Sequence, residues 1–185
     1  MDHLRQGHLP CAKLNHPPED ALVHLRDAVP EDEAFLFELY AAARADEFAL
    51  LPEAQRPVLL RFQYLAQSGA YRAMYPGTGY RIVLRDAQPV GRIWIAELEN
   101  EVRLVDIALL PGARNSGIGS LLVGQLQRRA QAAGKPLRSS VFRFNPGSLR
   151  WHQRLGFRVA GQDELRIDLE WLAEIPQSRR EPVVS

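Results

Sequence analysis

The chain has 185 residues, a length that fits one domain with a well-developed core. Its 46% hydrophobic and 24% charged residues are ordinary for a soluble globular protein, and its net charge of +1 gives no reason to expect nucleic acid or an anionic membrane as a partner. The single cysteine, Cys11, excludes an internal disulfide, so we expect a reducing, cytoplasmic location.

The first 20 residues contain three prolines, no periodic pattern and no apolar stretch of the kind that a secretion signal or a membrane span requires. We therefore expect an N-terminal extension over residues 1–20, a folded domain over 21–174 and a C-terminal tail over 175–185. The extension carries three residues of metal-binding types, but their spacing matches no standard zinc pattern, so no metal site is predicted at His8, Cys11 and His16.

A short strand is expected over residues 22–28, followed by a helix that starts at Pro30, where proline suits the first turn. Apolar residues recur at helical spacing over the next turns, which predicts an amphipathic helix. A second helix is expected over about residues 54–67. Tyr71 and Tyr75 fall after it, either as packing residues or as part of an acceptor pocket.

Three strands follow over residues 80–86, 88–98 and 101–110, and each shows apolar alternation. Their connections are short and polar, so we expect an antiparallel meander. Three acids near its second turn are most simply explained as solvated charges, namely Glu97, Glu99 and Glu101.

The second half of the chain begins with a helix from Gly117 to Ala133 that Gly134 terminates. A strand over residues 136–144 leads to Asn145, which has the character of an N-cap before a short helix. Two further strands, over residues 157–162 and 164–172, are expected to form a hairpin.

The segment "RNSGIGS" at residues 114–120 joins the third meander strand to the helix at Gly117. The N–H groups of a helix N-terminus attract anions, and glycines allow a ligand to approach the backbone closely. The third glycine of a dinucleotide-binding loop is replaced by Leu122, and the lysine of a nucleotide P-loop is absent. A different phosphate-containing ligand is therefore expected.

Two motifs together resemble the GNAT superfamily of N-acetyltransferases, which use acetyl-CoA. The first is Arg-x-x-Gly-x-Gly, which begins here at Arg114. The second begins with an asparagine and ends in Gly-Phe eleven and twelve residues later, as in "NPGSLRWHQRLGF" from Asn145 to Phe157. The family has a tyrosine seven residues after this asparagine, and this chain has His152 there. The resemblance covers about residues 22–172.

The resemblance implies a mixed α/β (α+β) fold with a mostly antiparallel sheet of about seven strands and about four flanking helices. It also implies acetyl-CoA as the cosubstrate. The pyrophosphate would bind the loop formed by Arg114, Asn115, Ser116, Gly117, Ile118, Gly119 and Ser120. The pantetheine arm would bind the backbone of Ile107, Ala108 and Leu109 and lie near Asn145. This strand has to part from its neighbour over residues 136–144, for which a β-bulge is the usual device.

Acetyl transfer to an amine requires removal of a proton from a group whose pKa is roughly 10.4, and polarisation of the thioester carbonyl. The resemblance assigns polarisation to backbone N–H groups around Leu109. It suggests that His152 protonates the leaving thiolate, and the alternative is a packed, inactive histidine. Asp106 is either the general base or a structural hydrogen-bond partner. Glu47 is a second candidate for the base, and a base acting through water is a third possibility.

The function expected from the resemblance is transfer of an acetyl group to a primary amine on a small molecule or a protein. The alternative is an acyl-CoA-binding or sensing domain without catalysis, because the family tyrosine is missing. Dimers are common in the family, so the expectation includes a homodimer as one arrangement.

Overall fold

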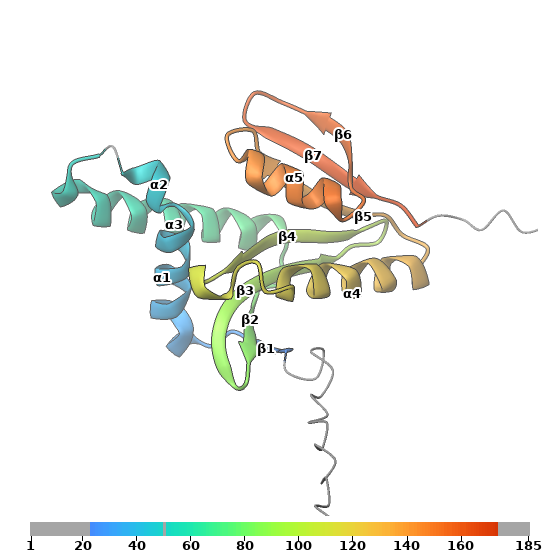
Figure 1. Cartoon of the computed structure of the whole chain (residues 1–185), viewed down its shortest axis with the longest axis horizontal. Coiled ribbons are helices and arrows are strands. Elements are labelled where there is room, and N and C mark those ends of the chain that lie inside the picture. Colours follow the sequence, from blue (N-terminus) through green and yellow to red (C-terminus); the bar gives the residue numbers. More distant parts are fainter. Residues whose placement is uncertain (1–22, 50, 174–185) are drawn as a thin grey trace, which may run out of the picture.

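A computed structural model describes residues 23–49 and 51–173 (Figure 1). The predicted extension over residues 1–20, which includes His8, Cys11 and His16, and the predicted tail over 175–185 lie outside the described residues. Within the described part of the chain, no helix has the length and apolar character needed to cross a membrane. The same residues contain no group of three or more His, Cys, Asp or Glu side chains placed to hold a metal ion.

Seven strands form one sheet in the order β1-β2-β3-β4-β5-β7-β6. All neighbouring pairs are antiparallel except β4 and β5, which are parallel. The meander and the C-terminal hairpin are confirmed, and so is the mostly antiparallel α/β fold class. The bounds are Val23–Asp27 for β1, Tyr80–Arg85 for β2, Gln88–Glu97 for β3, Val102–Leu109 for β4, Leu137–Phe142 for β5, Arg158–Gln162 for β6 and Arg166–Trp171 for β7.

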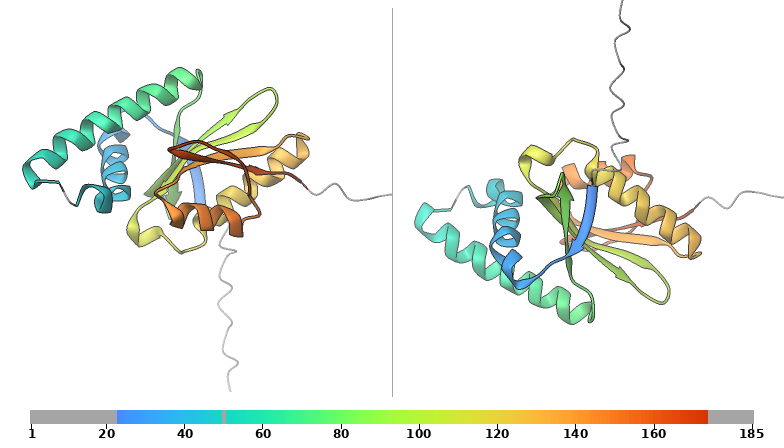
Figure 2. Two further views of the ribbon diagram at one scale, coloured as in Figure 1. Left: turned by 90° about the horizontal axis from the view of Figure 1, so that it is seen from above. Right: turned by 90° about the horizontal axis from the view of Figure 1, so that it is seen from below.

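Helices cover both faces of this sheet, with α1 and α3 on one side and α4 on the other (Figure 2). The apolar core therefore consists of two clusters, one on each face of the sheet. An aromatic cluster lies under α1 and α3, and a larger aliphatic cluster lies under α4. The helices are α1 Glu33–Ala43, α2 Ala45–Phe48, α3 Arg56–Met74, α4 Ile118–Ala132 and α5 Pro146–Arg154, with 3-10 turns at Pro30–Asp32, Glu53–Gln55 and Pro111–Ala113.

Helix α3 ends two turns later than the pattern predicts, because it continues through Gly69 to Met74. Tyr71 therefore lies in a helix and not in the segment before β2. It is buried and packs edge-on against Trp94 of β3, with ring centres 5.6 Å apart. This tertiary contact offsets the roughly 1 kcal/mol by which glycine disfavours a helix interior.

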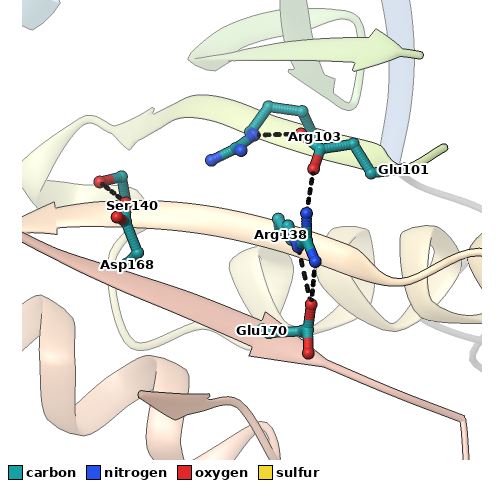
Figure 3. A network of polar contacts seen from close by, with 6 residues as sticks. All are labelled: Glu101, Arg103, Arg138, Ser140, Asp168 and Glu170. Carbon is teal, nitrogen blue, oxygen red and sulfur yellow. Dashed lines mark hydrogen bonds and ion pairs between the residues drawn. The ribbon is translucent and has the colours of Figure 1, made fainter. Parts of the chain in front are cut away.

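An ion-pair network ties β4, β5 and β7 together at one end of the sheet (Figure 3). Glu101 accepts a hydrogen bond from Arg103 at 2.7 Å and another from Arg138 at 2.9 Å, and Arg138 also bonds Glu170. Glu101 is only 7% exposed, so its assignment as a solvated charge is wrong. Arg103 lies two residues away, but Arg138 is distant in sequence on another strand, and alternation alone does not reveal that second pairing.

Beyond this network β4 and β5 part. The two strands pair over only three positions, from Val102–Leu137 to Leu104–Ser139. Immediately afterwards the register between β3 and β4 shifts, because Ile95 pairs with Leu104 whereas Trp94 pairs with Asp106. Val105 is the extra residue of a β-bulge, which bends a strand and increases its twist. The expected parting of the strands and its expected cause are both present.

Candidate active site

The separated part of β4 directs backbone groups toward the space that β5 has left. The Leu110 N–H donates to the Val90 oxygen on β3 at 2.9 Å. Because hydrogen-bonding directions alternate along a strand, the N–H and C=O groups of Leu109 and Ile107 face away from β3, and those of Ala108 face toward it. Of the three predicted backbone positions, two therefore face the gap.

A cavity of about 140 Å³ lies between the separated strands. It is closed by α5 on one side and by residues from the end of α1, from α2 and from α3 on the other. Six of the predicted site residues line it, namely Glu47, Asp106, Ile107, Ala108, Asn145 and His152. A larger cavity, of about 830 Å³, lies near β1 and the end of α3 and contains none of them.

The predicted phosphate loop, residues 114–120, lies outside the small cavity, after β4 and at the start of α4. Gly117 is the N-cap of α4 with a φ of 84°, a left-handed conformation that glycine adopts without strain. No side chain caps the helix there, so the first N–H groups of α4 have no side-chain acceptor. Asn115 and Ser120 are exposed beside them.

Other residues of the loop have structural contacts of their own. Ile118 is 4% exposed and belongs to the core, so only its backbone can reach a ligand. The Ser116 hydroxyl donates to the Ala113 oxygen. A Cβ on Gly119 would come within 3.1 Å of the Trp151 ring, which makes this glycine a packing requirement between α4 and α5.

Arg114 bonds the protein backbone. Its Nε donates to the Leu109 oxygen at 3.0 Å, and one terminal nitrogen lies 3.4 Å from the Ala42 oxygen at the end of α1. The side chain thus joins α1 to the end of β4. Because this bond engages the carbonyl oxygen of Leu109, the N–H of Leu109 is the free polar group that this residue directs away from β3.

His152 is 2% exposed and packs edge-on between Trp151 and Phe157. Its Nδ1 lies 2.9 Å from the Ser148 oxygen, an acceptor, so Nδ1 carries the proton. In the neutral ring Nε2 is then a bare acceptor, and it has no partner among the described residues. Burial lowers the pKa of His152 below its ordinary 6.5, although the bond to Ser148 opposes this.

Asp106 pairs with Arg92 of β3 at 2.7 Å. The arginine is 1% exposed, donates also to the Leu36 oxygen and lies over the Tyr80 ring. This partner accounts for a carboxylate in an apolar strand. Asp106 still lines the cavity and its side chain is 18% exposed, so it remains in contact with the site.

The remaining predicted residues lie at the edges of the cavity. Glu47 is on α2, and its carboxylate is 62% exposed and 3.7 Å from Arg44. Asn145 caps α5, and its Oδ1 accepts the Ser148 N–H at 2.9 Å, as predicted for an N-cap.

Sequence reasoning did not identify Arg44, Arg92 or Arg166, three further charged residues that line the cavity. For Arg92 a signal exists, because it is a charged residue in an apolar strand beside the strand that contains Asp106. For the other two, no local pattern distinguishes them from surface arginines.

Known proteins share the fold of this chain. Residues 34–157 match the model of the acetyltransferase (GNAT) family. A PaiA N-acetyltransferase from Thermoplasma acidophilum, solved in complex with coenzyme A, is 18% identical with a TM-score of 0.63, and the match covers 82% of this chain and 99% of that one. An acetyltransferase from Thermus thermophilus is 18% identical with a TM-score of 0.59, over 82% and 97% of the two chains. No curated protein sequence matches significantly.

Proposed function

Because the chain belongs to the acetyltransferase (GNAT) family, we propose that it transfers an acetyl group from acetyl-CoA to a primary amine by direct attack on the thioester. The observation that carries this proposal is the parting of β4 from β5, which opens a cavity lined by backbone groups and by a buried histidine with a bare nitrogen. A binding domain without catalysis has no evident use for that nitrogen.

The residues that follow the bulge in the chain fit an acyl-CoA ligand. The free N–H groups at the start of α4 suit the pyrophosphate, since they combine hydrogen-bond donors with the positive end of a helix. The N–H of Leu109, left free while Arg114 bonds the carbonyl of that residue, suits an amide of the pantetheine arm. Bound acetyl-CoA would supply the acetyl group as an activated thioester, and the outward N–H of Ile107, which lines the cavity together with His152, would hold the carbonyl oxygen as it gains negative charge.

His152 would receive the proton of the attacking amine at Nε2. The bond from Nδ1 to Ser148 fixes the tautomer that leaves Nε2 free, and burial keeps the ring neutral near pH 7. The imidazolium formed in this way then holds the proton that the departing thiolate needs. One nitrogen thus serves as the proton acceptor first and as the donor afterwards, which extends the donor role suggested by the family tyrosine.

Two measurements test the proposal. Release of the CoA thiol from acetyl-CoA, followed over a broad panel of amines, has to exceed hydrolysis without amine. Calorimetry with CoA then tests the loop with Ser120→Glu, because a carboxylate in the first turn of α4 suits the helix but repels pyrophosphate. We expect at least tenfold weaker binding, about 1.4 kcal/mol, and near-normal binding for Ser120→Gln. Binding without any turnover would identify a sensor instead.

A further inference from the structure

At one edge of the cavity, two guanidinium groups lie near the same aromatic ring. Arg166 is the first residue of β7 and pairs with Phe142 of β5, and its guanidinium lies 4.6 Å from the centre of that ring. Arg44, just after α1, approaches the same ring to 6.0 Å. All three residues line the cavity. Segments that are distant in sequence thus bring two cations to one edge of it.

The guanidinium N–H groups of Arg44 and Arg166 are free to donate hydrogen bonds to a ligand. Among the described residues, neither guanidinium makes a hydrogen bond, and Arg166 has no carboxylate within ion-pair distance. The nearby Asp163 uses its Oδ1 to accept backbone N–H groups of Leu165 and Arg166 instead. Arg44 is largely buried and stacks 4.1 Å from the Tyr40 ring centre, and the one carboxylate that it reaches among the described side chains is that of the exposed Glu47, at 3.7 Å. Such an exposed pair is weak.

The charges around the cavity do not balance. Arg92 and Asp106 neutralise one another at 2.7 Å, and Arg44 and Glu47 do so loosely. Arg166 has no carboxylate partner among the described residues that line the cavity, so three arginines face two carboxylates there while His152 is neutral, and the charge of Asp163 acts on Arg166 from outside the lining. A positive cavity repels an ammonium ion and attracts a ligand that also carries a negative group. The phosphates of acyl-CoA do not meet this need, because the loop at 114–120 does not line this cavity.

We infer that the acceptor is a small amine that carries a carboxylate, such as a free amino acid, and that Arg166 and Arg44 bind this carboxylate beside Phe142. The inference rests on the proposed function and specifies its substrate class. Guanidinium groups match the planar carboxylate with paired N–H donors. The cavity, about 140 Å³, is below the roughly 300–1,000 Å³ of sites for drug-sized ligands and would also receive the acetyl end of acetyl-CoA, so the part of the acceptor that enters it has to be small, as a free amino acid is.

The test compares each free amino acid, α and ω, with its primary amide and its decarboxylated amine as acceptors, at saturating acetyl-CoA. We expect the best acceptor to be an amino acid, with kcat/KM at least tenfold above its amide and its amine. A neutral amine, a polyamine or a peptide as the best acceptor would overturn the inference and leave the proposed function standing. Failure of every amine would instead contradict the proposed function.

Variants locate the contact. Arg166→Gln should raise KM for the preferred amino acid at least tenfold, reduce turnover of its amide much less and leave the affinity for acetyl-CoA unchanged. Arg158→Gln, which removes an exposed arginine from neighbouring β6, is the matched control for the change of charge. Equal losses with the acid and the amide in folded Arg166→Gln protein would mean that Arg166 acts through structure, and the carboxylate contact would be wrong.

Discussion

The histidine at position 152 differs from the family tyrosine in what it offers at neutral pH. A phenol has a proton to donate, whereas this imidazole has its proton committed to the Ser148 oxygen and a lone pair left at Nε2. Donation therefore requires that the ring first be charged, which burial disfavours. At this position the local hydrogen bond, more than the residue type, determines the direction of proton transfer.

Replacement of His152 tests that direction. We expect His152→Phe to lower kcat by about 10²-fold, the low end for acid–base catalysis, with acetyl-CoA affinity nearly intact. His152→Tyr should lose a similar amount, since it restores a donor but no acceptor. The acidic limb of the wild-type profile of kcat/KM against pH should lie below 6.5, because the pKa of His152 is lowered, and both variants should lack it.

Two outcomes would contradict this role. If His152→Tyr retains most of the wild-type rate, donation to the thiolate is the principal function of position 152. If His152→Phe matches the wild type across the pH range, the histidine is only a packing residue.

At the scale of single elements, β4 depends on a glycine of its neighbour. A Cβ on Gly91 would lie 2.5 Å from both the Ala108 oxygen and a methyl group of Leu109. Gly91 pairs with Leu109, the last residue of β4, so this close approach fixes where the outward N–H of Leu109 lies. A side chain at Gly91 has to displace that strand end.

We expect Gly91→Ala to lower the free energy of unfolding by about 1–3 kcal/mol, the usual cost of overpacking, and to weaken acetyl-CoA binding as well. Urea denaturation and calorimetry measure the two effects. Gly79→Ala is the control, because no atom lies within 4 Å of the added Cβ there. Identical stability and affinity for the two variants would show that β4 does not need the close approach.

Some elements and site residues could be predicted from the sequence, and others could not. The start of α4, the N-cap at Asn145 and the meander follow from local signals, since turn, cap and alternation act over a few residues. The extension of α3 past Gly69 does not, because contacts with β3 stabilise it. The pairing of Arg92 with Asp106 and the approach of Arg44 and Arg166 to the Phe142 ring depend on strand register and on packing between distant segments, which no local pattern contains.

For the whole molecule, burial of one histidine makes stability depend on pH. Well above pH 6.5 His152 is neutral in both the folded and the unfolded chain and contributes no pH dependence. Below 6.5 the unfolded chain takes up a proton that the folded protein resists, because the folded pKa is lowered. The free energy of unfolding should therefore fall as the pH decreases through 6.5, with a slope of up to about 1.4 kcal/mol per pH unit.

Urea denaturation of the wild type and of His152→Gln, at intervals between about pH 5 and 7.5, measures this effect, since the window spans the ordinary pKa of histidine. The glutamine variant should show a shallower slope than the wild type below pH 6.5. Parallel slopes for the two proteins would mean that other groups cause the acid sensitivity.

The gap between β4 and β5 also bears on strand addition by other chains. An open strand edge with free N–H and C=O groups is a template on which other chains can add strands, and proteins usually block such edges with charges or prolines. Here the open edge of β4 lies in the middle of the sheet and lines a cavity that α5 and the end of α1 close. The protein thus keeps a set of backbone groups ready for a ligand while it denies them to a strand from another molecule.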